Sequence, residues 1–197
     1  MAELRFDGQG AIVTGGGRGI GKAIAIKLAE EGVHVVVAST SLEPAVQVVK
    51  EVEARGCKGL AIQTDVSNFD DVKRAVARTI EQFGQIDILV NNAGGSARGK
   101  MSLFCDSEED TWDYVLGTNL KGVFYTCRQV IGHMLNNGRG SIINIGSVAG
   151  KGFAGTSNAV YAASKGAVIS LTMTAAQQLG RRHRGESDDA PEPALRG

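Results

Sequence analysis

The sequence has few cysteines, and this shortage excludes two classes of protein. Three cysteines occur in 197 residues, an odd number, at positions 57, 105 and 127. They lack the spacing of metal ligands, so neither a disulfide-stabilised scaffold nor a metal site is expected. Cys57, Cys105 and Cys127 are instead expected to be buried or incidental thiols in a reducing, cytoplasmic environment.

An excess of charge of either sign is also lacking. The 21 basic and 21 acidic side chains give a formal net charge of zero, which leaves no electrostatic basis for binding nucleic acid. No apolar run approaches the roughly 18 residues that a membrane-spanning helix needs. Residues 1–7 also lack the apolar core of a signal peptide. We therefore expect neither a nucleic-acid partner nor a membrane partner.

Segments typical of strands and helices alternate along the chain. The short apolar runs typical of buried strands are residues 11–13, 33–38, 60–63, 86–90 and 141–145. The segments with helical periodicity are residues 20–31, 42–55, 70–83, 109–136 and 158–179. This alternation predicts an α/β fold, a Rossmann-type doubly wound parallel sheet with helices on both faces and right-handed crossovers.

A glycine-rich turn between the first strand and the first helix is the most informative motif. It has the spacing Thr14-Gly15-x-x-x-Gly19-x-Gly21, which differs from the G-x-G-x-x-G of other dinucleotide-binding domains. By itself such a cluster is compatible with a plain flexible turn. Its place before an amphipathic helix favours binding of a pyrophosphate, because free N–H groups and the positive end of the helix dipole then meet the anion.

Other polar residues follow the later strands. Asp65 follows the third strand, Asn92 the fourth and Ser147 the fifth, and ligands of such sheets bind beyond the carboxyl ends of the strands. Tyr161 and Lys165 are four residues apart on one face of the last helix. They are compatible with an ordinary surface pair, as Ser147 is with a helix cap. Together, a phenol, a nearby cation and a hydroxyl suit the reduction of a carbonyl by a nicotinamide.

With these residues in place, the sequence resembles the short-chain dehydrogenase/reductase family. The resemblance covers about residues 6–180 and looks nearest to the 3-oxoacyl-(acyl-carrier-protein) reductases. It rests on the glycine turn, Asn91-Asn92-Ala93-Gly94, Asn119 within residues 117–122, Ser147, and Tyr161-x-x-x-Lys165.

The resemblance implies catalytic roles for four residues. Tyr161 would be the general acid/base, and Lys165 would assist it while binding the nicotinamide ribose. Ser147 would orient the substrate oxygen, and Asn119 would hold a water in a proton relay. Without the resemblance, Asn119 would be only a polar residue within a helix. The positions expected to bind the cofactor are Gly15, Arg18, Gly19, Ile20, Gly21, Ser39, Asp65, Val66, Asn92, Ala93, Gly94, Tyr161 and Lys165.

The end of the second strand indicates which cofactor is preferred. An acidic residue there would bind the ribose 2′-hydroxyl of NAD, but residues 38–41 contain no carboxylate. Ser39 leaves room for a 2′-phosphate, and Arg18 in the turn is placed to pair with it, although a solvated loop cation is the alternative. We therefore expect NADP, with NAD as the alternative.

The carboxyl-terminal part of the sequence departs from the family pattern. The apolar pattern stops near residue 180, where family members continue with two further strands. We expect a dinucleotide-binding domain at 1–180 and a disordered charged tail at 181–197. The sheet is expected to be truncated at its C-terminal side, with about five strands instead of seven and the fifth strand as an open edge.

Two functions follow from these features. The first is an NAD(P)-dependent oxidoreductase acting on a ketone or secondary alcohol, with a 3-oxoacyl thioester as a candidate substrate. The alternative is a truncated, non-catalytic dinucleotide-binding fragment that needs a complete partner subunit. The resemblance also implies a homodimer or homotetramer formed through helices 109–136 and 158–179, with Val115, Val123 and Val130 on the first helix and Ala167, Leu171 and Ala175 on the second.

Overall fold

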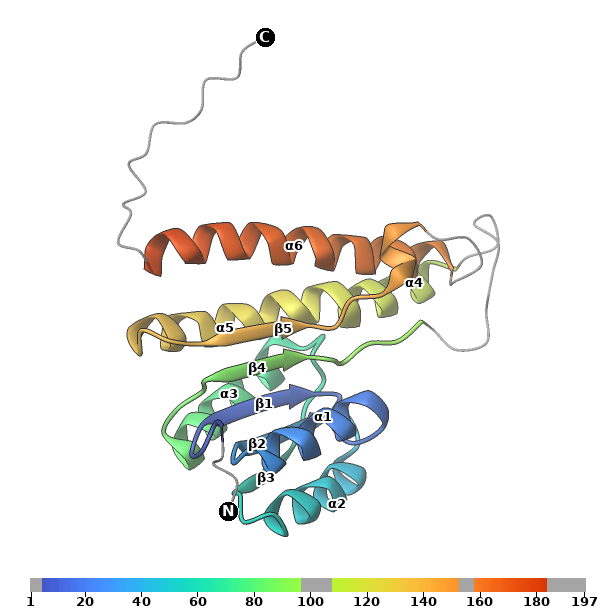
Figure 1. Ribbon diagram of the computed structural model, residues 1–197. Helices are drawn as coiled ribbons and strands as arrows, with labels where there is room; N and C mark the ends of the chain where they lie inside the picture. The colour runs from blue at the N-terminus through green and yellow to red at the C-terminus, as the bar shows by residue number, and fades with distance from the viewer. Residues whose placement is uncertain (1–4, 97–107, 153–157, 184–197) are drawn as a thin grey trace.

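Five parallel strands form a single twisted sheet in the computed structural model (Figure 1), which describes residues 5–96, 108–152 and 158–183. The strand order is β3-β2-β1-β4-β5. The strands are β1 (Gly10–Thr14), β2 (His34–Ser39), β3 (Gly59–Gln63), β4 (Ile88–Asn91) and β5 (Ser141–Asn144). The register pairs Thr14 with Ala38 and Asn91 with Asn144, so the carboxyl ends of the strands lie along one edge. The α/β fold expected from the sequence is confirmed.

Helices cover both faces of the sheet because alternate strand residues point to opposite sides. Ala11 and Val13 of β1 pack in one cluster with α1 (Gly19–Glu30) and α2 (Leu42–Glu53). Ile12 belongs to the opposite cluster, with α3 (Phe69–Phe83) and α5 (Gly122–Asn136). β2, which lies between β3 and β1, is buried on both sides through Val35, Val36 and Val37.

The helix expected at 109–136 consists of three pieces. α4 (Glu109–Leu116) is followed by a π-helical turn, Gly117–Lys121, and then by α5. Asn119 lies in this π-helical turn, which is wider than an α-helical turn, and it is fully buried. The last helix, α6 (Ala159–His183), contacts both α4 and this π-helical turn. α6 extends three residues into the segment expected to be a disordered tail, and residues 184–197 lie outside the described structure.

Three valines proposed to face a partner subunit point into the protein instead. Val115, Val123 and Val130 are at most 5% exposed, because they lie on the core side of α4 and α5. The exposed apolar side chains of these helices and α6 include Trp112, Phe124 and Met173. The expected contact between subunits therefore needs a different set of residues, although the same helices remain candidates.

The fifth strand lies at one edge of the sheet in the described part of the chain, and Ile143 is 45% exposed there. Of the cysteines, Cys57 is buried and Cys127 partly buried, and burial raises the pKa of both thiols. Cys105 lies outside the described residues. Among the helices described, none is both long enough and apolar enough to cross a lipid bilayer.

Candidate active site

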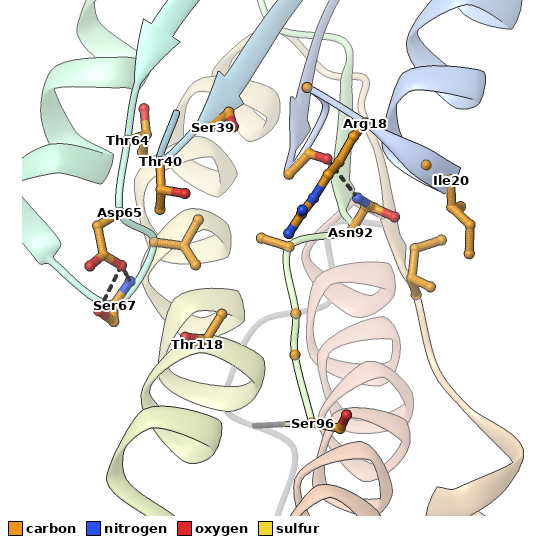
Figure 2. A pocket seen from close by; sticks show the side chains of 18 of the residues that line it. Arg18, Ile20, Ser39, Thr40, Thr64, Asp65, Ser67, Asn92, Ser96 and Thr118 are labelled. Atoms are coloured by element: carbon orange, nitrogen blue, oxygen red, sulfur yellow. Dashed lines mark hydrogen bonds between the residues drawn. The ribbon is translucent and has the colours of Figure 1, made fainter. Parts of the chain in front are cut away.

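A cleft of about 1000 Å³ opens beyond the carboxyl ends of the strands, at the upper end of the usual size of ligand pockets. It collects residues that are far apart in the sequence (Figure 2). Of the expected cofactor and catalytic positions, those that line it are Gly15, Arg18, Gly19, Ile20, Ser39, Asp65, Val66, Asn92, Ala93, Gly94, Ser147, Tyr161 and Lys165. Gly21 and Asn119 are buried and do not line the cleft. Sequence analysis did not single out Asp113, Tyr114 and Thr118, which line the cleft from α4 and the π-helical turn.

The glycine turn brings bare backbone to the cleft. Gly15 has a φ of +63°, and a Cβ there would lie 3.0 Å from both Ala93 Cα and Asn92 Nδ2. A Cβ at Gly21 would lie 2.4 Å from the carbonyl oxygen of Gly15, so the turn can close only with glycine at this position. α1 then begins at Gly19 with no acidic residue in its first turn. Its N–H groups and dipole are therefore available to an anion.

Hydrogen bonds of Thr14 and Asn92 connect the segment that follows β4, which we call the β4 exit, to the glycine turn. Thr14 Oγ1 accepts hydrogen bonds from the N–H groups of Asn92 and Ala93, at 3.1 and 3.0 Å. In return, Asn92 Nδ2 donates to the carbonyls of Thr14 and Gly15, at 3.0 and 3.2 Å. These bonds fix two walls of the cleft relative to each other.

The end of β2 provides hydroxyl groups and no carboxylate. Ser39 Oγ accepts a hydrogen bond from the N–H of Ser41 at 3.3 Å. Figure 2 shows Arg18 extending from the turn into the cleft, with Ser39 and Thr40 lining the same cleft. Asp65, farther along the wall, accepts from Ser67 N and Oγ at 2.9 and 2.7 Å. Its own N–H donates to Asp71, and this bond is the main cause that lowers the pKa of the Asp71 carboxyl.

Tyr161, Lys165 and Ser147 line the same cleft. The Lys165 ammonium lies 5.9 Å from the centroid of the Tyr161 ring, over its face. Its Nζ donates to the carbonyl of Ile145 at 2.6 Å. Lys165 is only 5% exposed, and this burial lowers its pKa. Ser147 Oγ accepts from Ala149 N at 3.2 Å, so the residue caps the short helix Val148–Lys151 and also lines the cleft.

Asn119 is placed differently from the other expected catalytic positions. Its Oδ1 accepts from Gly95 N at 2.9 Å, and its Nδ2 donates to Gly95 O at 3.1 Å and to Ser164 Oγ at 3.0 Å. Both N–H donors of the amide thus bond protein atoms, and the side chain connects the segment after β4 to α6.

Two further polar side chains beside Tyr161 were missed in the sequence. Asn158 and Ser164 are 7% and 0% exposed, and each bonds the backbone of Tyr161. Asn158 immediately precedes α6, and asparagine at such an N-cap position was a usable signal. Ser164 carried no comparable signal. Across the described ranges, no cluster of three or more His, Cys, Asp or Glu side chains suits a metal ion.

Comparison with known proteins assigns the chain to a family. The family model described as short chain dehydrogenase matches residues 9–183, so the chain belongs to the short-chain dehydrogenases, a family of oxidoreductases. The chain is 44% identical over 176 residues to a 3-oxoacyl-[acyl-carrier-protein] reductase of Staphylococcus epidermidis, covering 88% of this chain and 70% of the relative.

Two other relatives extend the comparison. A (2S)-[(R)-hydroxy(phenyl)methyl]succinyl-CoA dehydrogenase subunit of Thauera aromatica is 39% identical over 171 residues, covering 87% of this chain and 67% of the relative. The crystal structure of a short chain dehydrogenase/reductase from Burkholderia phymatum in complex with NAD superposes with a TM-score of 0.84 at 36% identity. That match covers 92% of this chain and 63% of the solved one.

The donor set of the cleft fits a dinucleotide. The glycine turn leaves backbone free for a pyrophosphate, and a side chain at Gly15 or Gly21 would collide with neighbouring atoms. The hydroxyl of Ser39 and the carboxylate of Asp65 line the cleft, as does the buried ammonium of Lys165. These features suit the phosphate, ribose and base parts of one extended ligand.

Proposed function

We propose that this protein is an NADP(H)-dependent oxidoreductase that interconverts a ketone and a secondary alcohol. One observation carries the proposal: Tyr161, Lys165 and Ser147 line the same cleft as the glycine turn. A proton donor is thus placed in one continuous space with an anion-binding helix terminus. A bound nicotinamide supplies or accepts the hydride, and the remaining work belongs to the protein's own side chains.

Tyr161 gives a proton to the substrate oxygen in the reducing direction and takes it back in the oxidising direction. The Lys165 ammonium, 5.9 Å from the ring centroid, stabilises the phenolate left after the proton has gone. Ser147 donates a hydrogen bond to the same substrate oxygen while its lone pairs accept from Ala149 N. Within the described residues, the Lys165 ammonium donates one hydrogen bond, to the carbonyl of Ile145, and its remaining donors would bind the ribose hydroxyls.

The preference for NADP rests on Arg18 and Ser39. The guanidinium extends into the cleft (Figure 2), and within the described residues no carboxylate is seen to pair with it. A phosphate on the ribose would provide this partner through charge-assisted hydrogen bonds. Ser39 is small and uncharged, so it would not repel that phosphate.

A 3-oxoacyl thioester is the proposed substrate class. Two of the relatives are named for thioesters, one of acyl carrier protein and one of coenzyme A. Tyr114, which is 56% exposed, lines the same cleft as Tyr161, and its aromatic side chain suits an acyl chain.

Oxidation of NADPH and of NADH by the purified protein tests the proposal. The panel contains β-ketoacyl thioesters, β-ketoesters, diketones and sugars, and absorbance of the reduced cofactor is followed. The proposal predicts substrate-dependent oxidation, faster with NADPH and fastest with a β-ketoacyl thioester.

A second candidate is a dinucleotide-binding protein without turnover that works only with a complete subunit. The observation in its favour is that the chain spans 70% of the Staphylococcus epidermidis relative and 63% of the Burkholderia phymatum structure. Tight NADPH binding without oxidation of any substrate would favour this candidate.

A further inference from the structure

A closed ring of hydrogen bonds surrounds the backbone of Tyr161. On one side, Asn158 Oδ1 accepts from Tyr161 N at 2.9 Å, and Asn158 Nδ2 donates to Ser96 O at 3.0 Å. On the other side, Ser164 Oγ donates to Tyr161 O at 2.7 Å and accepts from Asn119 Nδ2 at 3.0 Å. Asn119 then holds both the N–H and the carbonyl of Gly95. Because Gly95 and Ser96 are consecutive, the ring closes.

The three side chains that form the ring are buried. Asn119 and Ser164 are 0% exposed and Asn158 is 7% exposed. Within the described chain, no buried side-chain nitrogen or oxygen is left without a partner. A fully satisfied buried polar network is rigid, because opening it leaves donors or acceptors unpaired away from water.

The ring joins three pieces of the protein that border the cleft. These are the exit of β4 at Gly95 and Ser96, the π-helical turn with Asn119, and the first turns of α6. The same exit segment passes close to Lys165, since a Cβ at Gly94 would lie 3.6 Å from its Nζ and 3.1 Å from Asn119 Oδ1. The ring therefore fixes the position of the first turn of α6, which carries Tyr161, relative to residues 92–94 in the wall of the cleft.

We propose that Asn158 and Ser164 are positioning residues, which fix Tyr161 against the β4 exit through this ring. The proposal rests on the proposed function, in which Tyr161 transfers a proton. Neither residue touches the reacting atoms; each acts through the backbone of Tyr161. A displacement of about 1 Å at a reacting group can cost on the order of a hundredfold in rate, so a loosened ring is expected to lower kcat.

The decisive variant is Asn158→Ser, because it keeps the helix-capping role of this side chain and removes its hydrogen bond to Ser96 O. A serine hydroxyl still accepts from Tyr161 N as an N-cap, but it is too short to donate to Ser96 O. We expect a Tm near that of the wild type, a kcat lowered at least about tenfold, and a KM for NADPH changed by less than about threefold. Ser164→Ala, which removes one oxygen from a buried site, should show the same division between kcat and KM.

A matched control is Asn68→Ala at the start of α3. Asn68 caps that helix by accepting from the N–H groups of Asp70 and Asp71, and it does not line the cleft. Its loss should lower the Tm and leave kcat unchanged. If Asn158→Ser and Ser164→Ala retain kcat within about twofold of the wild type, the positioning role is wrong.

Hydrogen–deuterium exchange separates this proposal from the proposed function. The ring predicts faster exchange of the backbone amides of residues 95 and 96 in Asn158→Ser than in the wild type, with or without turnover. If the wild type reduces no substrate, the proposed function fails, whereas faster exchange in the variant still supports the ring. Equal exchange in both proteins overturns it.

Discussion

At the scale of single residues, Lys165 supports the proposal that the cleft is a site of chemistry. Its ammonium is 5% exposed and donates to a backbone carbonyl, that of Ile145, at 2.6 Å. Burying a charge without an opposite charge is costly, and the resulting desolvation lowers the pKa of Lys165. Such a cost is tolerated where the charge serves a function, in this case beside the ring of Tyr161.

The choice of cofactor is tested at Ser39. Ser39→Asp would place a carboxylate where it can accept from a ribose 2′-hydroxyl and repel a 2′-phosphate. We expect the ratio of the Kd values for NADPH and NADH to shift toward NADH by about tenfold or more, the effect of roughly 1.4 kcal/mol. Fluorescence titration of both reduced cofactors gives the ratio. A wild type that binds NADH more tightly than NADPH would show that Arg18 does not select the phosphate.

The closure of the glycine turn is tested at Gly21. A Cβ at this position would lie 2.4 Å from Gly15 O and 2.5 Å from Asn92 Nδ2, so Gly21→Ala must displace the turn. Overpacking of this kind costs about 1–3 kcal/mol, and cofactor binding should weaken with it.

Gly132→Ala is the matched control for this substitution. Gly132 lies in α5, and nothing is within 4 Å of a Cβ built there. Helix propensity predicts a gain of about 0.5–1 kcal/mol in stability for this substitution. Urea unfolding of both variants, with cofactor titration, decides the matter: a Gly21→Ala protein as stable and as tightly binding as the wild type contradicts the account.

At the scale of elements, the sequence predicted the order of strands and helices, and the boundaries differ by a few residues for identifiable reasons. β4 begins at Ile88 and not at Ile86, because the N–H of Ile86 donates to His133 Nε2, a partner that no local pattern reveals. The helix expected at 109–136 is interrupted by a π-helical turn at Asn119. Its apolar periodicity continues through the interruption, so no local pattern indicates it.

The residues of the candidate site that belong to a sequence motif were predictable. Those that depend on tertiary contacts were not. Gly15, Tyr161 and Lys165 belong to spacings that can be read directly, and they line the cleft. Ser164 acts through a bond to Asn119, 45 positions away in the sequence, which only the folded chain brings together. Similarly, the inward orientation of Val115 depends on how α4 packs.

The start of β2 predicts a pH dependence of stability. His34 Nδ1 accepts from the N–H of Lys58 at 3.2 Å. Burial, aided by the charge of Lys58 and opposed by that of Asp7, lowers the pKa of His34 from its ordinary 6.5. The folded protein therefore binds this proton more weakly than the unfolded chain does. This contribution to stability is complete above about pH 6.5 and is lost as the pH falls through the lowered value.

The variant His34→Asn isolates this contribution, since its Oδ1 can accept from Lys58 N but does not titrate. Urea unfolding from pH 8 to pH 5 should show a smaller loss of stability in the variant than in the wild type. Parallel curves for the two proteins would contradict the assignment to His34.

At the scale of the whole molecule, the exposed apolar side chains predict self-association. Trp112, Phe124 and Met173 are 38%, 50% and 62% exposed on α4, α5 and α6. In the described part of the chain, β5 adds an edge strand with Ile143 exposed. We propose that these side chains form one interaction surface, because contiguous exposed apolar patches mark such surfaces. We expect a homodimer or homotetramer through these helices, and a Tm not above about 65 °C, the upper end for mesophilic domains.

Sedimentation velocity and thermal melts test the assembly together. Phe124→Ser should shift the protein toward monomer without removing a buried side chain, and Gly132→Ala, on the same helix, should leave the sedimentation coefficient unchanged. A wild-type monomer that melts well above 65 °C would show that neither the helix surface nor the β5 edge matters as proposed.

The central claim is that Tyr161 donates the proton while a nicotinamide in the same cleft gives the hydride, and labelled cofactor tests it most directly. NADPH carrying deuterium at the transferable position is incubated with a β-ketoacyl thioester, and mass spectrometry of the product counts the label. The account predicts an alcohol with one deuterium from the wild-type protein. Tyr161→Phe should form it at less than about a hundredth of the rate, since general acid catalysis is worth at least that much, with cofactor affinity nearly unchanged. An unlabelled product, or a Tyr161→Phe protein that transfers deuterium as fast as the wild type, would contradict it.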